Sequence, residues 1–402
     1  MIISIPKENK EQIIENIINA PKEFTPILFS NDMTFKQFLD IGNFTKFEDD
    51  CALPSQYILN IEYIDTKTIV YGDYLLFADG ELNWQLYIVC EPYDEYSSGI
   101  KSFIATCKHV LNILDDDRNI NTVFEGETLE NAIATCLVKS QFTATFNDVG
   151  LSAENVYRKI ECESPISAIQ FICENLKCEF KPRIIINISN PITVDLYLDF
   201  YYSLGLNKGL ILKIVYNTDI SNILFDDSNL ATALEGTGTD KQGNVIDIYD
   251  IQWSISNGDP LDKPLNQTFL EDPEATNTYG ISVGEGSSIK KPVFDFYTSQ
   301  SMTPETLIWD MYEQIQKRKA PLINYPVNLK LLESIYKNQK VELGDTIRLI
   351  LVKNENIIFT GNVRVVRIIL DRLYSENDKV ELSNVISPHT HYISKYILKQ
   401  SI

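Results

Sequence analysis

The sequence predicts an α+β chain of several domains, ordered as a β unit, a small α+β unit and a second β unit with a long insertion. Its 402 residues are enough for about two to four domains of ordinary size. Apolar residues make up 44% of the chain, which supplies normal buried cores and argues against disorder. The apolar spacing changes from strand-like to helix-like near residue 104 and back to strand-like near residue 190. These two changes set the expected order of the units.

The first unit, residues 1–103, is expected to be a small antiparallel sheet or barrel preceded by a helix. Isoleucines at helical spacing predict an amphipathic helix over 7–19, which Ala20-Pro21 would close. Apolar and polar residues alternate over 57–63, as a half-buried strand requires. Asp79-Gly80 predicts a hairpin between strands 74–77 and 82–90, and Ser97-Ser98-Gly99 predicts a further turn.

The second unit, residues 104–189, is expected to be a small α+β domain. Apolar residues at helical spacing predict helices over 104–114 and 128–138. Ser164-Pro165 combines a favourable N-cap with proline at the first helical position, which predicts a third helix from residue 165. Short strands are expected on either side, at 142–146 and 179–186.

The third unit is expected to combine residues 190–220 with 326–385. Residues 194–201 alternate between an apolar face and a face that carries Asp195 and Asp199. A turn at 205–209 would join them in a hairpin to a strand over 210–216. Further strands are expected in the last part of the chain, at 327–332, 345–352, 357–360, 363–370 and 379–382.

The insertion, residues 221–325, is expected to be peripheral and rich in loops over 255–300. Gly236-Thr237-Gly238 is interpreted as a tight hairpin loop between strands 230–234 and 245–253. Thr303-Pro304 starts the clearest helix of the chain, and Lys317-Arg318-Lys319 lies where the helix dipole favours cations.

The charge excludes several classes of partner. The formal net charge is −21, so the chain would repel phosphate backbones and anionic membranes. The first residues lack the basic and apolar regions of a secretory signal, and no apolar run is long enough for a membrane span. We therefore expect a soluble protein made in a cytoplasm. The seven scattered cysteines are expected to be reduced core thiols.

No catalytic residue, metal site or cofactor site is predicted. His389 and His391 could share a strand face and meet a metal, but an exposed C-terminal tail over 386–402 is favoured. His109 is expected to be a packed core residue rather than part of a catalytic triad. Gly236-Thr237-Gly238 lacks the helix N-terminus that a phosphate loop needs. The acidic run 115–117 is interpreted as a solvated helix end.

Four segments carry local patterns that recur together in one known family. They are residues 104–115 (IATCKHVLNILD), 164–180 from Ser-Pro-Ile to Glu-Phe, 226–236 (DDSNLATALEG), and the closing helix followed by 341–346 (VELGDT) and 366–368. In this order, over about residues 58–385, the chain resembles the N-terminal region of phage tail-tip hub proteins. These are the tail-associated lysins (Tal), or prophage tail endopeptidases, which are related to the baseplate hub of contractile tails.

The resemblance implies a structural role. In this family two barrel-like domains per subunit form a homotrimeric ring of six similar barrels that caps the tail tube and passes DNA. Residues 1–103 and 190–220 with 326–385 would supply the barrels, and 104–189 and 221–325 would be peripheral. The implied partners are the distal tail protein ring, the tape measure protein and receptor-binding proteins or fibres. The implied location is the virion tail tip or baseplate, with assembly in the host cytoplasm and no specific binding of nucleic acid.

The resemblance leaves enzyme activity and adhesion as alternatives. Many Tal proteins continue into a wall-degrading or fibre domain, whereas this chain stops about twenty residues after Leu382, so we expect no enzyme activity. A carbohydrate-binding adhesin, using its 21 tyrosines and three tryptophans for stacking, is the first alternative. A carboxylate-dependent cell-wall hydrolase is the second. Under the hub hypothesis Asp195 and Asp199 would line a DNA channel.

Overall fold

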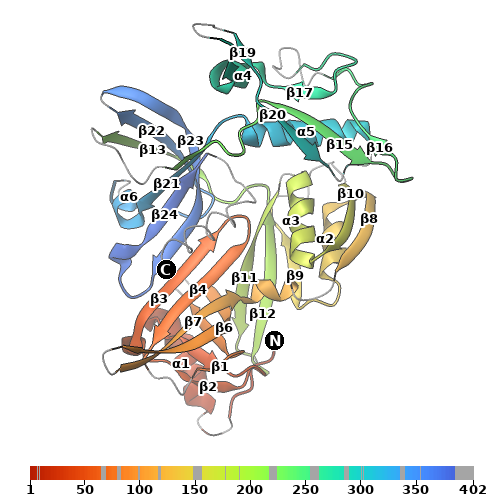
Figure 1. The fold of residues 1–402 in the computed structure, drawn as a ribbon. Coiled ribbons are helices and arrows are strands. Elements are labelled where there is room, and N and C mark those ends of the chain that lie inside the picture. The colour runs from red at the N-terminus through yellow and green to blue at the C-terminus, as the bar shows by residue number, and fades with distance from the viewer. Residues whose placement is uncertain are drawn as a thin grey trace.

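The computed structural model is a mostly-sheet α+β fold in which four groups of elements surround a central junction (Figure 1). It describes residues 1–6, 8, 10–64, 69–78, 83–97, 100–115, 119–147, 156–176, 178–189, 191–216, 224–253, 262–284, 289–299, 301, 303–335, 340–353 and 355–384. One large sheet runs through two of the groups. A smaller sheet, with the longest helix of the described chain, forms the third group, and two helices with a β-ribbon form the fourth.

The N-terminal part of the large sheet matches the expected β unit closely. Its elements are α1 (Lys10–Glu23), β1 (Ile27–Phe29), β2 (Phe35–Phe38), β3 (Phe44–Ala52), β4 (Gln56–Tyr63), β5 (Tyr74–Ala78), β6 (Trp84–Ser97) and β7 (Ile100–His109). In β4 every second residue is buried, which confirms the predicted alternation. Strands β5 and β6 pair antiparallel, as the predicted hairpin requires, although its turn at Asp79-Gly80 lies outside the described residues. Helix α1 continues past Pro21, so the predicted end at Ala20-Pro21 is wrong.

The helix predicted over 104–114 is wrong. Residues 100–109 are strand β7, which pairs with β4 and β6 on either side, and residues 110–114 form a 3₁₀-helix. Cys107, Leu111 and Leu114 are all buried, and their spacing of four and three residues is the same as that of the apolar face of a helix. The actual cause is a central strand that passes directly into a tight helical turn.

Four elements of the α+β unit match the prediction: α2 (Leu129–Leu137), β9 (Phe142–Phe146), α3 (Pro165–Leu176) and β11 (Glu179–Asn187). The strands β8 (Ile120–Glu127) and β10 (Val156–Glu163) were not predicted. The hydroxyl of Ser164 accepts a hydrogen bond from the backbone of Ser167, which confirms the predicted start of α3. Helices α2 and α3 pack together beside the ribbon of β8 and β10 (Figure 1).

The predicted hairpin of residues 194–201 with 210–216 does not form. Strand β12 (Thr193–Tyr201) pairs with β11 and β9, whereas β13 (Asn207–Tyr216) pairs in parallel with β22 (Thr346–Lys353). The alternation in β12 is confirmed, since Val194, Leu196, Leu198 and Phe200 are all buried. Turn residues and alternation specify two strands here but not which partner each takes.

The closing strands complete the second region of the large sheet. Strand β22 pairs with β23 (Asn356–Asp371), which pairs with β24 (Lys379–Ser383), and β24 pairs with β21 (Leu322–Asn328). A short strand, β14 (Leu224–Asp226), lies at the outer side of β21. The strand predicted over 327–332 is wrong beyond Asn328, where α6 (Leu329–Ile335) begins and buries Leu329 and Leu332.

The insertion has its own small sheet. Strand β15 (Ala233–Thr239) pairs with β16 (Val245–Ile246), β17 (Phe269–Glu271) and β20 (Phe294–Thr298), and α5 (Pro304–Arg318) packs on it. Helix α4 (Pro273–Tyr279) and the ribbon of β18 (Ile281–Ser282) with β19 (Lys290–Lys291) lie at the outer end (Figure 1). The capping box at Thr303 confirms the predicted start of α5.

The hairpin loop predicted at Gly236-Thr237-Gly238 is wrong, because all three residues lie inside β15. A Cβ on Gly236 would come within 2.6 Å of the sulfur of Met311, and one on Gly238 within 2.5 Å of the carbonyl of Ser301. The glycines therefore allow α5 and the chain before it to pack closely against the strand.

Three separate clusters of buried apolar residues support these groups. The largest extends from Ile3 to Phe200 and includes the α+β unit, the second lies between β13, α6 and the closing strands, and the third lies under α5. The strand order of the large sheet runs from β14 to β9 without closing among the described residues. The barrel-like form expected of the two β units, and the boundaries expected for the domains, stay predictions.

Candidate functional site at the junction of the cores

The two regions of the large sheet are joined by pairing between β3 and β23. Arg367 lies opposite Ala52 and Asp371 lies opposite Glu48, with antiparallel pairing between them. Arginines at 364, 367 and 372, on or just after β23, each bind an acidic residue of the N-terminal region. The junction therefore combines a backbone ladder with charged contacts of long sequence separation.

Arg367 binds two carboxylates at the middle of this junction. Its Nη2 and Nε lie 2.6 and 2.7 Å from the two oxygens of Asp50, and its Nη1 lies 2.8 Å from Oε1 of Glu381. Burial opposes the charge of Arg367, but the hydrogen bonds and charge of Asp50 and Glu381 outweigh it and raise its pKa. The guanidinium is thus held charged between two strands.

Arg372 closes the lower end of the junction through Asp49. Its Nη2 lies 2.8 Å from Oδ2 of Asp49, and the hydroxyl of Tyr87 donates to Oδ1 of the same carboxylate at 2.6 Å. Asp49 is only 2% exposed, so both contacts are needed to stabilise its charge. Beside it, the fully buried ring of His109 packs between Tyr57 and Tyr87.

His109 is a core residue, as the sequence predicts. Its Nδ1 accepts a hydrogen bond from the backbone of Leu111 and caps the 3₁₀-helix. Burial lowers the pKa of His109 to about 3, and the charge of Asp49 offsets only part of this effect. The imidazole is therefore neutral at physiological pH and has a structural role.

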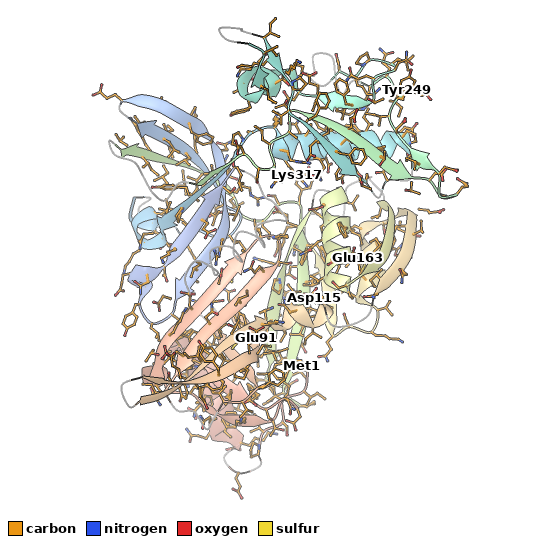
Figure 2. The ribbon with its side chains drawn as sticks, viewed as in Figure 1. Met1, Glu91, Asp115, Glu163, Tyr249 and Lys317 are labelled. Atoms are coloured by element: carbon orange, nitrogen blue, oxygen red, sulfur yellow. The ribbon has the colours of Figure 1, made fainter. Side chains whose placement is uncertain are left out.

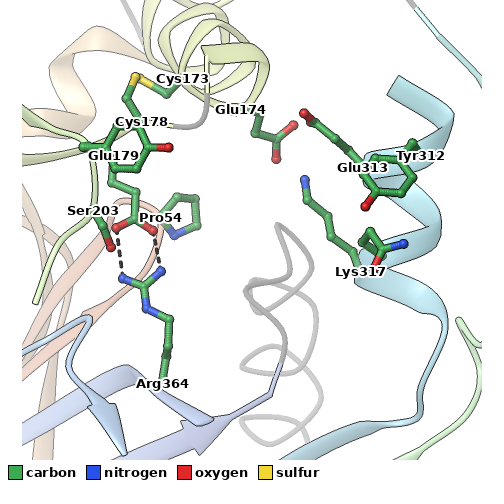
Figure 3. A pocket seen from close by; sticks show the side chains of 12 residues that line it. Pro54, Cys173, Glu174, Cys178, Glu179, Ser203, Tyr312, Glu313, Lys317 and Arg364 are labelled. Atoms are coloured by element: carbon green, nitrogen blue, oxygen red, sulfur yellow. Dashed lines mark hydrogen bonds and ion pairs between the residues drawn. The ribbon is translucent and has the colours of Figure 1, made fainter. Parts of the chain in front are cut away.

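Arg364 and Glu179 form the upper contact of the junction. The guanidinium donates to both oxygens of Glu179 at 2.7 and 3.0 Å (Figure 3). It also donates to the carbonyls of Leu204 and Gly344. Glu179 further accepts from the backbone of Leu204 at 2.6 Å. One arginine thus ties together β11, the turn after β12 and the turn before β22.

The sequence Gly344-Asp345-Thr346 organises the same turns. Asp345 is fully buried, and its carboxylate accepts from the backbones of Leu206 and Glu342 and from Lys208 at 2.8 to 2.9 Å. Gly205 and Gly344 have positive φ values of 71° and 91° and pack backbone against backbone. A Cβ on Gly205 would lie 2.2 Å from that backbone, so the turn requires glycine.

A cavity of about 430 Å³ lies where the three cores meet. Helix α3 contributes Cys173 and Glu174, α5 contributes residues from Tyr312 to Lys317, and Arg364 with Glu179 forms part of the wall. In Figure 3, Glu174 of α3 points toward Glu313 and Lys317 of α5 across the gap. The cavity thus lies between groups of elements, where ligand sites are common.

The residues considered from the sequence are not brought together. His389, His391, Asp116 and Asp117 lie outside the described residues, and Asp115 accepts from the hydroxyl of Ser164. Among the described residues no group of three or more histidine, cysteine and acidic side chains is placed to hold a metal ion. No helix of the described chain is long and apolar enough to cross a membrane.

Asp199 is not a bare carboxylate. It is 3% exposed and accepts hydrogen bonds from Thr145 and from Arg183, whose Nη2 lies 2.8 Å away. Burial alone would raise the pKa of Asp199, but the hydrogen bonds of Arg183 and Thr145 outweigh it and lower the pKa. Its charge is therefore compensated within the chain, and it contributes little to an electronegative channel.

The junction residues themselves were missed by the sequence analysis. The one signal that the sequence offered was a charged residue, Arg364 or Arg367, within the otherwise apolar run 363–370 of β23. Glu179 and Asp50, the acids that they bind across the junction, lie 185 and 317 residues away, which no local pattern reveals.

Comparison with known proteins gives a family-model match over part of the chain and a shared fold over most of it. Residues 208–390 match the family model described as prophage endopeptidase tail. No curated protein matches the chain. The prophage tail protein gp18 of Listeria monocytogenes EGD-e aligns with a TM-score of 0.60 and 14% identity, over 93% of this chain and 98% of that one.

Two further tail proteins have the same fold. The 43 kDa tail protein of prophage MuSo2 from Shewanella oneidensis aligns with a TM-score of 0.55 and 12% identity, over 89% of this chain and 97% of that one. The tail protein from Neisseria meningitidis MC58 aligns with a TM-score of 0.52 and 11% identity, over 89% and 95% of the two chains. The resemblance to prophage tail proteins that the sequence indicates is confirmed, and the fold is theirs over most of the chain.

Proposed function

We propose that this protein is a structural component of a phage or prophage tail, the hub at the tail tip or baseplate. The observation that carries the proposal is the fold, which three tail proteins, two of them from prophages, share over nearly their whole lengths. The family match from β13 through the closing strands supports it independently of the structure. In this role the chain would be a virion component that is assembled in the host cytoplasm.

In its finer form, the proposal is a homotrimeric ring that caps the tail tube and gives DNA a passage. The two regions of the large sheet would act as the two tube-like modules of each subunit, with the α+β unit and the insertion at the periphery. The junction supports this arrangement, because its ion pairs and strand pairing fix the two regions in one orientation. A ring whose subunits must repeat with a fixed angle needs such rigidity.

The net charge of −21 is consistent with a DNA passage. Three copies would place a large negative charge around the axis, so phosphates would gain nothing from counterion release on binding. Partners in the assembly would be the distal tail protein ring, the tape measure protein and the receptor-binding proteins or fibres. Their contacts would lie on the exposed faces of the modules.

Mass in solution tests the trimer. Light scattering during size-exclusion chromatography should give three times the monomer mass of 45.9 kDa, at least in the presence of the distal tail protein. Electron microscopy of that complex should show a ring with an open or plugged centre. A chain that stays monomeric alone and with the distal tail protein would overturn the ring.

We further propose that the described chain acts without enzymatic activity. The family name contains the word endopeptidase, so the proposal needs a direct test. Zymography on cell-wall material and a peptidoglycan-release assay should show no clearing with the purified chain. Clearing that a Glu174→Gln or Glu313→Gln variant abolishes would instead favour a carboxylate-dependent hydrolase at the central cavity.

A further inference from the structure

One wall of the central cavity is formed by helix α5. The buried face of α5 holds Leu307, Ile308, Met311 and Ile315 against the small sheet. The opposite side presents Trp309, Tyr312, Glu313, Gln316 and Lys317, of which the last four line the cavity. These residues follow one another at three- and four-residue spacing, so they form one continuous stripe along the helix.

The stripe begins in a cluster of aromatic rings. The ring of Trp253 lies 5.1 Å from that of Trp309 and 5.5 Å from that of Tyr312, edge to face in both cases. Trp309 is 44% exposed, and Tyr312 reaches the cavity. Tyr202, 60% exposed, lines the cavity as well. Two of the three tryptophans of the chain thus contact Tyr312, and the cavity is lined by a tyrosine from each of two separate segments.

The charged groups of the cavity do not form an anion site. Arg364 uses four of its N–H groups on Glu179 and on the carbonyls of Leu204 and Gly344. The remaining lining cation is Lys317, and it faces two carboxylates, Glu174 and Glu313 (Figure 3). A phosphate or sulfate group would therefore meet at least as much negative as positive charge.

We propose that this cavity binds a short neutral saccharide, with Tyr312 as its stacking platform. A pyranose ring has an apolar face of C–H groups that packs on an aromatic ring and a rim of hydroxyls that both donate and accept. The carboxylates accept from such hydroxyls, Lys317 donates, and Gln316 and Ser203 do both. A volume of about 430 Å³ is that of a small-ligand site and fits a few sugar rings.

The proposal is independent of the ring proposed above, because the cavity is formed within one chain. Saccharide binding with no trimer, or a trimer with no saccharide binding, would separate the two. A site of this kind on a tail protein would contact surface glycans of a cell.

Titration with defined sugars tests the site on the full chain. The probes are two trisaccharides, tri-N-acetylglucosamine and maltotriose, and inorganic phosphate serves as the anionic comparison. Binding is measured by tryptophan fluorescence and by calorimetry. We expect at least one trisaccharide to bind and to change the fluorescence, since the rings of Trp253 and Trp309 contact Tyr312, which lines the cavity. Tyr312→Leu should weaken binding about tenfold or more, as the loss of an aromatic platform implies.

Tyr249→Leu is the matched control. Tyr249 is 42% exposed in the same insertion but lies at its outer end, away from the cavity near Lys317 (Figure 2). The affinity of the Tyr249→Leu variant for the trisaccharide should stay within about twofold of that of the parent protein. If Tyr312→Leu does not fold by circular dichroism, Gln316→Ala tests the same wall. Absence of binding to both trisaccharides at about 10 mM, tighter binding of phosphate, or equal losses in the cavity and control variants would overturn the proposal.

Discussion

Arg364 and Glu179 lie 185 residues apart in the chain, and the guanidinium of one binds both carboxylate oxygens of the other. Arg364 belongs to β23, whose apolar neighbours lie in the second core, whereas Glu179 begins β11, which packs in the first. The same guanidinium binds two backbone carbonyls, of Leu204 and Gly344, in the turns before β13 and β22. This pair therefore fixes the turns as well as the two cores.

Replacing Arg364 by methionine should destabilise the chain by about 2 kcal/mol. The substitution keeps the apolar stem of the side chain, but it leaves the carboxylate of Glu179 and two backbone carbonyls without their charged donor. A hydrogen bond to a charged group contributes about 1.5–3 kcal/mol to stability. Each side chain of the pair is only about one-fifth exposed, so solvent replaces the lost contacts poorly. Urea unfolding monitored by tryptophan fluorescence measures this change in the free energy of unfolding, from the first transition of the curve.

Lys241→Met is the control for this variant. Lys241 lies 2.7 Å from Glu125, but the two side chains are 54% and 50% exposed, so solvent screens the pair. Its removal should change stability by less than about 0.5 kcal/mol. Equal effects of the two variants would show that Arg364 has no special role at the junction.

Gly205→Ala should be far more damaging than Gly209→Ala. Both glycines have positive φ, 71° and 69°, so each alanine carries a similar backbone strain of about 1–2 kcal/mol. At Gly209 nothing lies within 4 Å of an added Cβ, whereas at Gly205 the backbone of Gly344 and Asp345 lies 2.2 Å away. The two residues therefore separate strain from crowding.

Thermal unfolding of both variants measures this difference. We expect Gly205→Ala to lower the free energy of unfolding by at least about 3 kcal/mol, or to prevent folding, because the turn must open to admit a methyl group. Gly209→Ala should stay folded with a modest loss. Variants of equal stability would mean that the turns at 205 and 344 do not pack as described.

The elements that depend on local sequence were predicted well. The alternation of β4 and β12, the cap before α3 and the capping box before α5 each arise from residues a few positions apart. Failures occurred where two local structures share one pattern. Residues 104–114 have helical apolar spacing because a strand that pairs on both edges is followed by a 3₁₀ turn. Gly236 and Gly238 indicate close packing rather than a loop.

The partners of the strands and the cavity were beyond local reasoning. Strand β13 pairs with β22, whose residue Arg348 lies opposite Ile211, so the apparent hairpin with β12 was replaced by a pairing across most of the second half of the chain. The cavity wall draws on α3 and β11, which follow each other in the chain, and on α5 and β23, which lie more than 100 residues further on. Only the fold, which the resemblance indicated, brings them together.

Asp345→Asn should destabilise the chain by about 2 kcal/mol. The carboxylate of Asp345 is fully buried and accepts hydrogen bonds from two backbone N–H groups and from Lys208. Asparagine replaces one accepting oxygen by an NH₂ group, which is itself a donor and cannot accept these bonds. Equilibrium unfolding in urea gives the difference. Glu342→Gln is the matched control, because Glu342 lies 3.8 Å from the same lysine but is 56% exposed.

The control should lose less than about 0.5 kcal/mol. Since both substitutions remove one acidic charge beside Lys208, a difference between them isolates the buried hydrogen bonds. If Glu342→Gln were as damaging as Asp345→Asn, the charge of Lys208, and not the turn, would be what Asp345 supports.

His109 should make the folded state progressively less stable as the pH falls below about 6.5. Burial lowers its pKa to about 3, so between these values the unfolded chain binds a proton that the folded chain does not. Stability from this group is fully present above pH 6.5 and is lost toward pH 3, with a slope of about 1.4 kcal/mol per pH unit. Asp199, whose lowered pKa adds loss in acid, contributes in the same direction.

The His109→Asn variant separates the contribution of the histidine to the pH dependence of stability from the contribution of carboxylates such as Asp199. Asparagine can still accept the hydrogen bond from the backbone of Leu111 at this cap, but it does not titrate. The variant should be less stable at pH 7.5, because it loses packing between Tyr57 and Tyr87, and the gap should narrow from pH 6.5 downward. Urea unfolding at half-unit pH steps gives this difference directly, and carboxylates common to both proteins cancel in it. A gap that stays constant to pH 4 would mean that the buried imidazole takes up its proton without unfolding, and that Asp49 rather than desolvation governs it.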